Sequence, residues 1–221
     1  MRSKFFAELL GTFAIVFFGC GAILSGHSGA AVVFGVSVSV MIYALGHISG
    51  AHFNPSVTLA FAVARHFPLK HVAHYWLAQF AGAFLAMAVL MVLIEPSATS
   101  SASAFPHDGV WIALAWETIL TFFLMFVIVA VSTDTRAVGT MAGLAIGAIV
   151  ALGAYVGGPH SGAAMNPARA LAPAVFEGRY EGIWIYFVGP IFGAILAAVI
   201  YAWIRCEQVE GEERSSAEGC C

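Results

Sequence analysis

Two copies of one short motif carry the side chains in this chain that are best suited to chemistry. The first copy is Ser49-Gly50-Ala51-His52-Phe53-Asn54-Pro55-Ser56, and the second is Ser161-Gly162-Ala163-Ala164-Met165-Asn166-Pro167-Ala168. An asparagine amide both donates and accepts hydrogen bonds, so it can bind a small polar molecule without carrying charge. Because each copy follows a long apolar segment, the repeat indicates a pore built from two halves.

The composition places these motifs in a membrane. The chain is 61% hydrophobic and 10% charged, with a mean hydropathy of +0.91, whereas soluble domains carry about 25% charged residues. The net charge of -3 gives no reason to expect nucleic acid. The four cysteines lack metal-ligand spacing, and the chain contains no nucleophile, phosphate-binding or paired-carboxylate motif. We therefore predict neither a metal, a cofactor nor an enzyme.

Six apolar segments are long enough to cross a hydrocarbon core of about 30 Å. They run over approximately 5–24, 31–48, 72–94, 111–131, 138–157 and 183–204. Two further apolar stretches, 54–64 and 166–176, begin at the Asn-Pro pairs, which are strong helix-start signals. At about 1.5 Å per residue, each stretch covers roughly half the membrane. The sequence thus predicts an all-α membrane protein with six transmembrane helices and two re-entrant half-helices.

The repeat extends beyond the asparagines and sets the topology. Glu8 stands four residues before Thr12-Phe13, as Glu117 does before Thr121-Phe122. Since each half has three spans, the second half must be inverted relative to the first, and the two half-helices enter from opposite faces. We expect one channel domain over 1–221, with half-repeats at 1–100 and 105–204 and a disordered cytoplasmic tail at 205–221.

Basic residues predict the orientation of this multi-pass chain. Most of them lie at the termini or after the second and fourth spans, namely Arg2, Lys4, Arg65, Lys70, Arg136, Arg205 and Arg214. Both termini are therefore expected in the cytoplasm, and the 95–110 connection, which has no lysine or arginine, is expected outside.

The segment before each asparagine must be non-helical backbone at membrane depth, which is tolerated only inside protein or along a water-filled cavity. Gly50 and Gly162 permit a tight path there. We expect a ladder of carbonyl acceptors along the lumen, from Ala51, His52, Phe53, Ala164 and Met165. The N-terminus of each half-helix adds roughly +0.5 elementary charge near the midplane, which disfavours cations and protons.

Three charged side chains inside the predicted spans need an explanation. Arg169, one turn into the second half-helix, is expected to be a lumen donor that repels cations, and the alternative is an arginine that snorkels to the interface. Glu8 and Glu117 are expected to accept hydrogen bonds from the re-entrant backbone, and a proton relay is the alternative.

His160 lies near the predicted exterior mouth. Its side chain could sense pH or could simply pack against its neighbours.

At this point the chain resembles the aquaporin, or major intrinsic protein, family from Phe5 to Trp203. The two boxes Asn54-Pro55-Ser56 and Asn166-Pro167-Ala168 carry the resemblance, with Ser56 in place of the family's alanine. The stretch from Gly46 to Pro55 is most similar to the plant nodulin-like intrinsic proteins and their bacterial relatives. The resemblance implies that the two boxes form the central constriction of an hourglass pore, one in each protomer of a homotetramer.

The resemblance also implies an outer selectivity filter made of Phe34, Ala154, Ala163 and Arg169. The resemblance implies that this filter is wider than a water-only filter, with one apolar wall and one strong donor, so we expect passage of water, glycerol, urea and neutral arsenous, boric or silicic acid. Ala170 and the pair Tyr186-Phe187 are instead typical of water channels, which leaves a water-selective aquaporin as the alternative. A secondary transporter is the alternative from another class, with Glu8 and Glu117 as its only candidate coupling groups.

Overall fold

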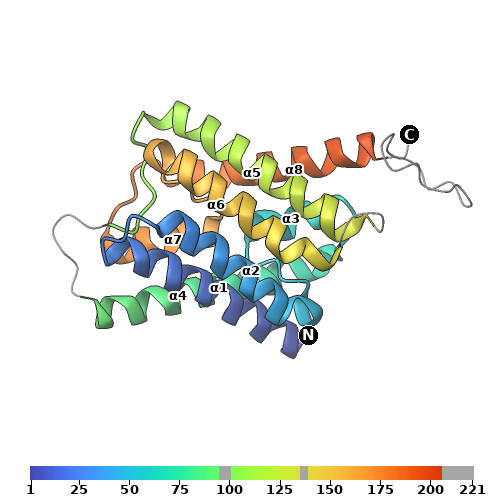
Figure 1. Ribbon diagram of the computed structural model, residues 1–221, viewed down its shortest axis with the longest axis horizontal. Helices are drawn as coiled ribbons and strands as arrows, with labels where there is room; N and C mark the ends of the chain where they lie inside the picture. Colours follow the sequence, from blue (N-terminus) through green and yellow to red (C-terminus); the bar gives the residue numbers. More distant parts are fainter. Residues whose placement is uncertain (95–100, 135–138, 206–221) are drawn as a thin grey trace, which may run out of the picture.

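The structure, a computed structural model, describes residues 1–94, 101–134 and 139–205, and over these ranges it contains helices and loops but no strand (Figure 1). In chain order the helices are α1 (Arg2–Leu24), α2 (Ala30–Ser49), α3 (Pro55–Val63), η1 (Leu69–His71), α4 (Val72–Leu93), α5 (Val110–Thr133), η2 (Gly139–Met141), α6 (Ala142–Ser161), α7 (Pro167–Glu177) and α8 (Ile185–Ile204).

Six of the described helices are long and apolar enough to cross a membrane, which confirms the predicted spans. α3 and α7, with 9 and 11 residues, are the two half-helices. The fifth span differs in its limits, because α6 begins at Ala142 and continues through Pro159 to Ser161 rather than ending near residue 157. The predicted tail falls almost wholly outside the described residues, as do positions 95–100 of the exterior loop.

The spanning helices run side by side, and the half-helices lie between them (Figure 1). The start of α1 and the end of α8 lie at the same end of the bundle; α3 lies toward that end and α7 toward the other. Small residues allow close packing in both halves. A Cβ added at Gly82 of α4 would lie 2.2 Å from the Leu9 oxygen of α1, and one added at Gly193 of α8 would lie 2.1 Å from the Thr118 oxygen of α5.

Each half-helix begins where its asparagine caps it. The Asn54 side chain accepts a hydrogen bond from the Ser56 N–H at 2.9 Å, and the Asn166 side chain accepts from the Ala168 N–H at 3.0 Å. Proline follows each asparagine at the first helical position, where its missing N–H costs nothing. The entry to each half-helix is thus fixed by two adjacent residues.

The backbone before each cap turns through the left-handed region repeatedly. Positive φ angles occur at Gly50, Ala51 and Phe53 in the first segment and at Gly162, Ala163 and Met165 in the second. A left-handed conformation in a residue other than glycine costs of order 1–3 kcal/mol, and it persists only where its surroundings impose it. Both segments must therefore be held by contacts from other elements.

In the first half, the carboxylate of Glu8 on α1 holds this segment. It accepts hydrogen bonds from the Ser49 hydroxyl at 2.6 Å, the His52 N–H at 3.0 Å and the Phe53 N–H at 2.7 Å. Gln79 on α4 donates to the same carboxylate at 2.8 Å. The Glu8 side chain is fully buried, so each of these bonds is sheltered from competing water.

Glu117 on α5 makes the matching contacts in the second half. It accepts from the Ser161 hydroxyl at 2.8 Å, the Ala164 N–H at 2.9 Å and the Met165 N–H at 2.7 Å, and it too is fully buried. No glutamine joins this carboxylate among the described residues, and the three bonds named here hold the second segment as the matching three hold the first.

These bonds make Glu117→Gln a direct test. The amide would place a donor against either the Met165 N–H or the Ala164 N–H, and leaving a buried N–H unpaired costs about 1–3 kcal/mol. We expect a lower thermal unfolding midpoint in detergent and reduced water permeability in proteoliposomes. Glu181→Gln, which changes an exposed carboxylate, is the matched control. An unfolding midpoint for Glu117→Gln equal to that of the control would contradict this role.

Candidate functional site

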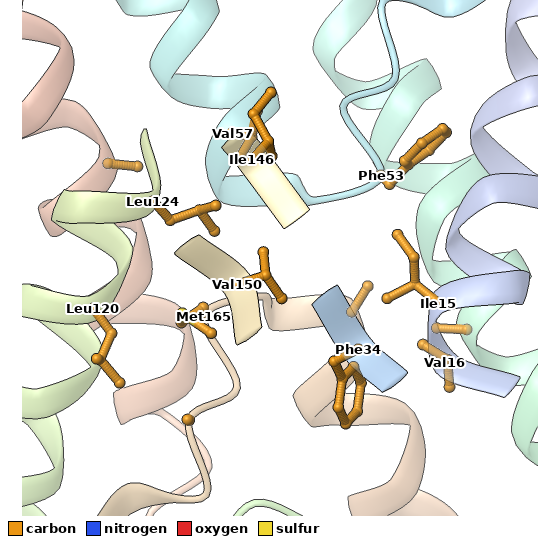
Figure 2. Close-up of a cluster of buried hydrophobic side chains, with 14 of the residues drawn as sticks. Ile15, Val16, Phe34, Phe53, Val57, Leu120, Leu124, Ile146, Val150 and Met165 are labelled. Carbon is orange, nitrogen blue, oxygen red and sulfur yellow. The ribbon is translucent and has the colours of Figure 1, made fainter. Parts of the chain in front are cut away.

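A cavity lies where the two capped segments meet, and its lining combines two kinds of groups. Apolar side chains line it, among them Ile15, Phe34, Leu124, Ile146 and Val150, which are labelled in Figure 2. The pair of re-entrant segments and Arg169 also line it. A small molecule in this cavity therefore meets both hydrocarbon and hydrogen-bonding groups.

Asn54 and Asn166 both line this cavity and connect the two halves of the chain. The Asn54 Nδ2 donates to the Met165 carbonyl at 2.7 Å, and the Asn166 Nδ2 donates to the Phe53 carbonyl at 2.9 Å. An amide nitrogen carries two hydrogens, so each asparagine keeps a second hydrogen that can be donated to a molecule in the cavity. The remaining members of the two boxes are buried in the first turns of α3 and α7, outside the cavity lining: Pro55, Ser56, Pro167 and Ala168.

The Ser56 hydroxyl, which replaces the alanine of the family motif, is fully buried and has no hydrogen-bond partner among the described residues. The Ser56 N–H nevertheless completes the Asn54 cap. The structure thus leaves the Asn54 donor in place, and nothing in it explains the extra hydroxyl.

All five residues of the expected carbonyl ladder line the cavity, namely Ala51, His52, Phe53, Ala164 and Met165. The Phe53 and Met165 carbonyls each accept from the opposite asparagine, so a second lone pair of each oxygen remains for a molecule in the cavity. The His52 ring is fixed by the Thr58 hydroxyl at 3.1 Å and by the ring of Phe61, with ring centroids 4.9 Å apart.

The four residues of the expected filter also line this cavity together. The Arg169 guanidinium carbon lies 5.1 Å from the centre of the Phe34 ring, within the range of a cation–π contact. Arg169 is 4% exposed, and its Nη1 donates to the Ala102 carbonyl at 3.3 Å. It does not snorkel, because its side chain is held inside the protein. Ala154 and Ala163 contribute only methyl groups.

Sequence reasoning missed a pair of tyrosines that support the segments from behind. The Tyr75 hydroxyl donates to the Ser49 carbonyl, and the Tyr186 hydroxyl donates to the Ser161 carbonyl, each at 2.7 Å. Their sequence separations from these serines, 26 and 25, are nearly equal. These nearly equal separations were the signal in the sequence that could have predicted the two contacts. It extends the repeat to the third helix of each half.

His160 lies apart from this cavity. Its Nδ1 is 2.5 Å from the Asp108 Oδ2, and its ring stacks on Trp116 with centroids 4.8 Å apart. The side chains of His160 and Asp108 are 40% and 43% exposed. The histidine is thus a partner of the loop before α5 and does not line the cavity.

The chain is similar to known proteins over most of its length. Residues 1–201 match the major intrinsic protein family. The chain is 47% identical to aquaporin NIP1-1 of Oryza sativa subsp. japonica over 210 residues, covering 91% of this chain and 74% of that protein. It is 45% identical to nodulin-26 of Glycine max, covering 91% and 78%. Among solved structures, the aquaglyceroporin from Plasmodium falciparum matches with a TM-score of 0.79 and 25% identity, over 92% of this chain and 96% of that one. An integral membrane chain with this helix order and these relatives is a channel rather than an enzyme, and it belongs to the major intrinsic protein family.

Proposed function

We propose that the chain is a passive channel for water and small uncharged solutes, among them glycerol, urea and neutral arsenous, boric or silicic acid, and that it excludes protons and ions. The observation that carries this proposal is the cavity wall where Phe34, Ala154, Ala163 and Arg169 come together. The pore would lie in one domain of two inverted half-repeats, in the plasma or inner membrane, with both termini cytoplasmic and four chains in a homotetramer.

The width of the filter supports solutes larger than water. Ala154 and Ala163 present one methyl group each, so neither side chain narrows the opening. The Phe34 ring lies against α1, where a Cβ added at Gly19 would be 2.1 Å from the ring. The missing side chain of Gly19 therefore provides the space that the ring occupies. A polyol could place its carbon chain against Phe34 and accept hydrogen bonds from Arg169.

Positive charge along the cavity accounts for the exclusion of cations and protons. The cavity passes the buried Arg169 and the N-termini of α3 and α7, all of which are positive. Neither Glu8 nor Glu117 lines the cavity, and their oxygens accept the hydrogen bonds of the re-entrant segments, so neither offers a carboxylate oxygen to a cation there. Because the oxygens of Glu8 and Glu117 are engaged in these hydrogen bonds, the structure argues against a transporter that couples solute movement to protonation of these two groups.

The residues that favoured a water-selective pore lie away from the cavity lining. Tyr186 is fully buried and its hydroxyl holds the Ser161 carbonyl. Phe187 stacks on Phe80 of α4, with centroids 6.4 Å apart, and Ala170 is buried in α7. Because none of the three lines the cavity, they carry less weight than the four residues that do.

Ala154→His tests the width of the filter. An imidazole would fill space that a polyol needs while still leaving room for water, so glycerol permeability should fall by about tenfold or more, the scale at which pockets reject an oversized group. Labelled glycerol uptake and osmotic water flux should be measured on the same proteoliposomes. Ala148→His, on the exposed side of α6, is the control. Equal losses of glycerol and water flux would mean that the filter lies elsewhere.

Arg169→Ala tests the charge at the filter. At an effective dielectric constant near 20, a unit charge about 4 Å away costs a passing cation about 4 kcal/mol. Its removal should raise cation leak by roughly tenfold or more and admit larger neutral solutes. Leak can be followed with a pH-sensitive dye and a potassium gradient. Arg179→Ala, an exposed arginine just after α7, is the control, and an unchanged leak in Arg169→Ala would refute the assigned role.

A further inference from the structure

The contact that holds the Arg169 guanidinium comes from a segment without regular structure. Its acceptor is the carbonyl of Ala102, which lies in the connection between α4 and α5 and is fully buried. Residues 101–103 form no helix whose ladder could fix this carbonyl. The position of the oxygen, and with it that of the guanidinium, must therefore depend on another contact.

Glu177, the last residue of α7, makes that contact. Its carboxylate accepts hydrogen bonds from the Ala102 N–H at 2.8 Å, the Ser103 N–H at 3.3 Å, the Ser101 hydroxyl at 2.5 Å and the Ser103 hydroxyl at 2.7 Å. These four bonds tie three consecutive residues to one carboxylate. Ala102 is bound on both sides, since its N–H donates to Glu177 and its carbonyl accepts from Arg169.

The contacts close a loop on a single half-helix. Arg169 lies in the first turn of α7 and Glu177 in the last, and the segment 101–103 joins the two along the side of the helix. Hydrogen bonds to an ionised carboxylate are shorter and stronger than those between neutral groups. Glu177 does not line the cavity, so it acts on a passing solute indirectly, and this segment connects its carboxylate to the Arg169 guanidinium.

We propose that Glu177 is a positioning residue of the selectivity filter, which fixes the Arg169 guanidinium through the Ala102 carbonyl and thereby sets the largest solute that passes. The proposal rests on the function proposed above, in which Arg169 belongs to the filter. When the carboxylate is removed, the segment loses its anchor, the guanidinium loses its fixed acceptor, and discrimination between solutes of different width declines.

A double-mutant cycle separates this role from a general effect on folding. Wild type, Glu177→Ala, Arg169→Ala and the double variant are reconstituted into proteoliposomes, and permeability is measured for water, urea, glycerol and erythritol. In Glu177→Ala, the ratio of glycerol to erythritol permeability should fall by about threefold or more, the scale of coupling within one hydrogen-bond network. In the Arg169→Ala background, the same substitution should leave that ratio unchanged.

Two results would overturn the proposal. One is a Glu177→Ala ratio equal to that of Glu181→Ala, which removes an exposed carboxylate a few residues later. The other is an equal change from Glu177→Ala with and without Arg169, because Glu177 would then act independently of the guanidinium. Where Glu177→Ala does not reach the membrane, Glu177→Gln keeps the length of the side chain, loses one acceptor oxygen and runs through the same cycle.

Failure of the proposed function gives a different pattern. If wild type conducts water but neither urea nor glycerol, the proposed solute range is wrong. The cycle then uses the ratio of water to urea permeability, and a fall of that ratio in Glu177→Ala that vanishes without Arg169 still supports the positioning role.

Discussion

The backbone of residues 50–54 and 162–166 lies inside a membrane protein without forming a helix, and the rest of the structure follows from that constraint. Its N–H groups need acceptors that neither water nor a helix ladder supplies there. Glu8 and Glu117 each pair with two of them, which holds left-handed conformations at residues such as Ala51 and Met165. Two fully buried carboxylates, an unfavourable choice elsewhere in an apolar chain, are therefore the means by which the segments keep their shape.

Once the segments are fixed, the asparagines join them into a single site. Asn54 and Asn166 each cap their own half-helix with the side-chain oxygen and reach across with the amide nitrogen to the opposite half. The oxygen and the nitrogen of each amide are thus both engaged in hydrogen bonds. These bonds fix the orientation of the amide and therefore the direction of its remaining N–H hydrogen. A molecule in the cavity meets donors and acceptors whose positions are already set, so its passage requires little rearrangement of the protein.

Periodicity and composition were sufficient to predict the six spans, the two half-helices and their inversion. The length of each apolar segment, the position of each Asn-Pro pair and the number of spans in each half can be read directly from the sequence. Periodicity and composition could not predict the left-handed backbone of Ala51 and Phe53. Glycine adopts positive φ angles readily and so indicates them in a sequence, whereas alanine and phenylalanine do not. Gln79 and the contact between Glu177 and Ala102 were also missed. Those contacts join segments more than 70 positions apart, and only packing in three dimensions brings them together. The C-terminal end of α6 lies beyond the predicted one because Pro159 is tolerated in its last turn.

We propose that one lumen through this chain passes water and small neutral solutes. Stopped-flow light scattering on proteoliposomes tests it most directly, by comparing a step into an impermeant sugar with an equal osmotic step into glycerol. We expect fast shrinkage in both, followed in glycerol alone by re-swelling faster than that of protein-free liposomes. Fast shrinkage with re-swelling no faster than that of protein-free liposomes would show a pore for water only and would contradict the width assigned to the filter at Ala154 and Ala163.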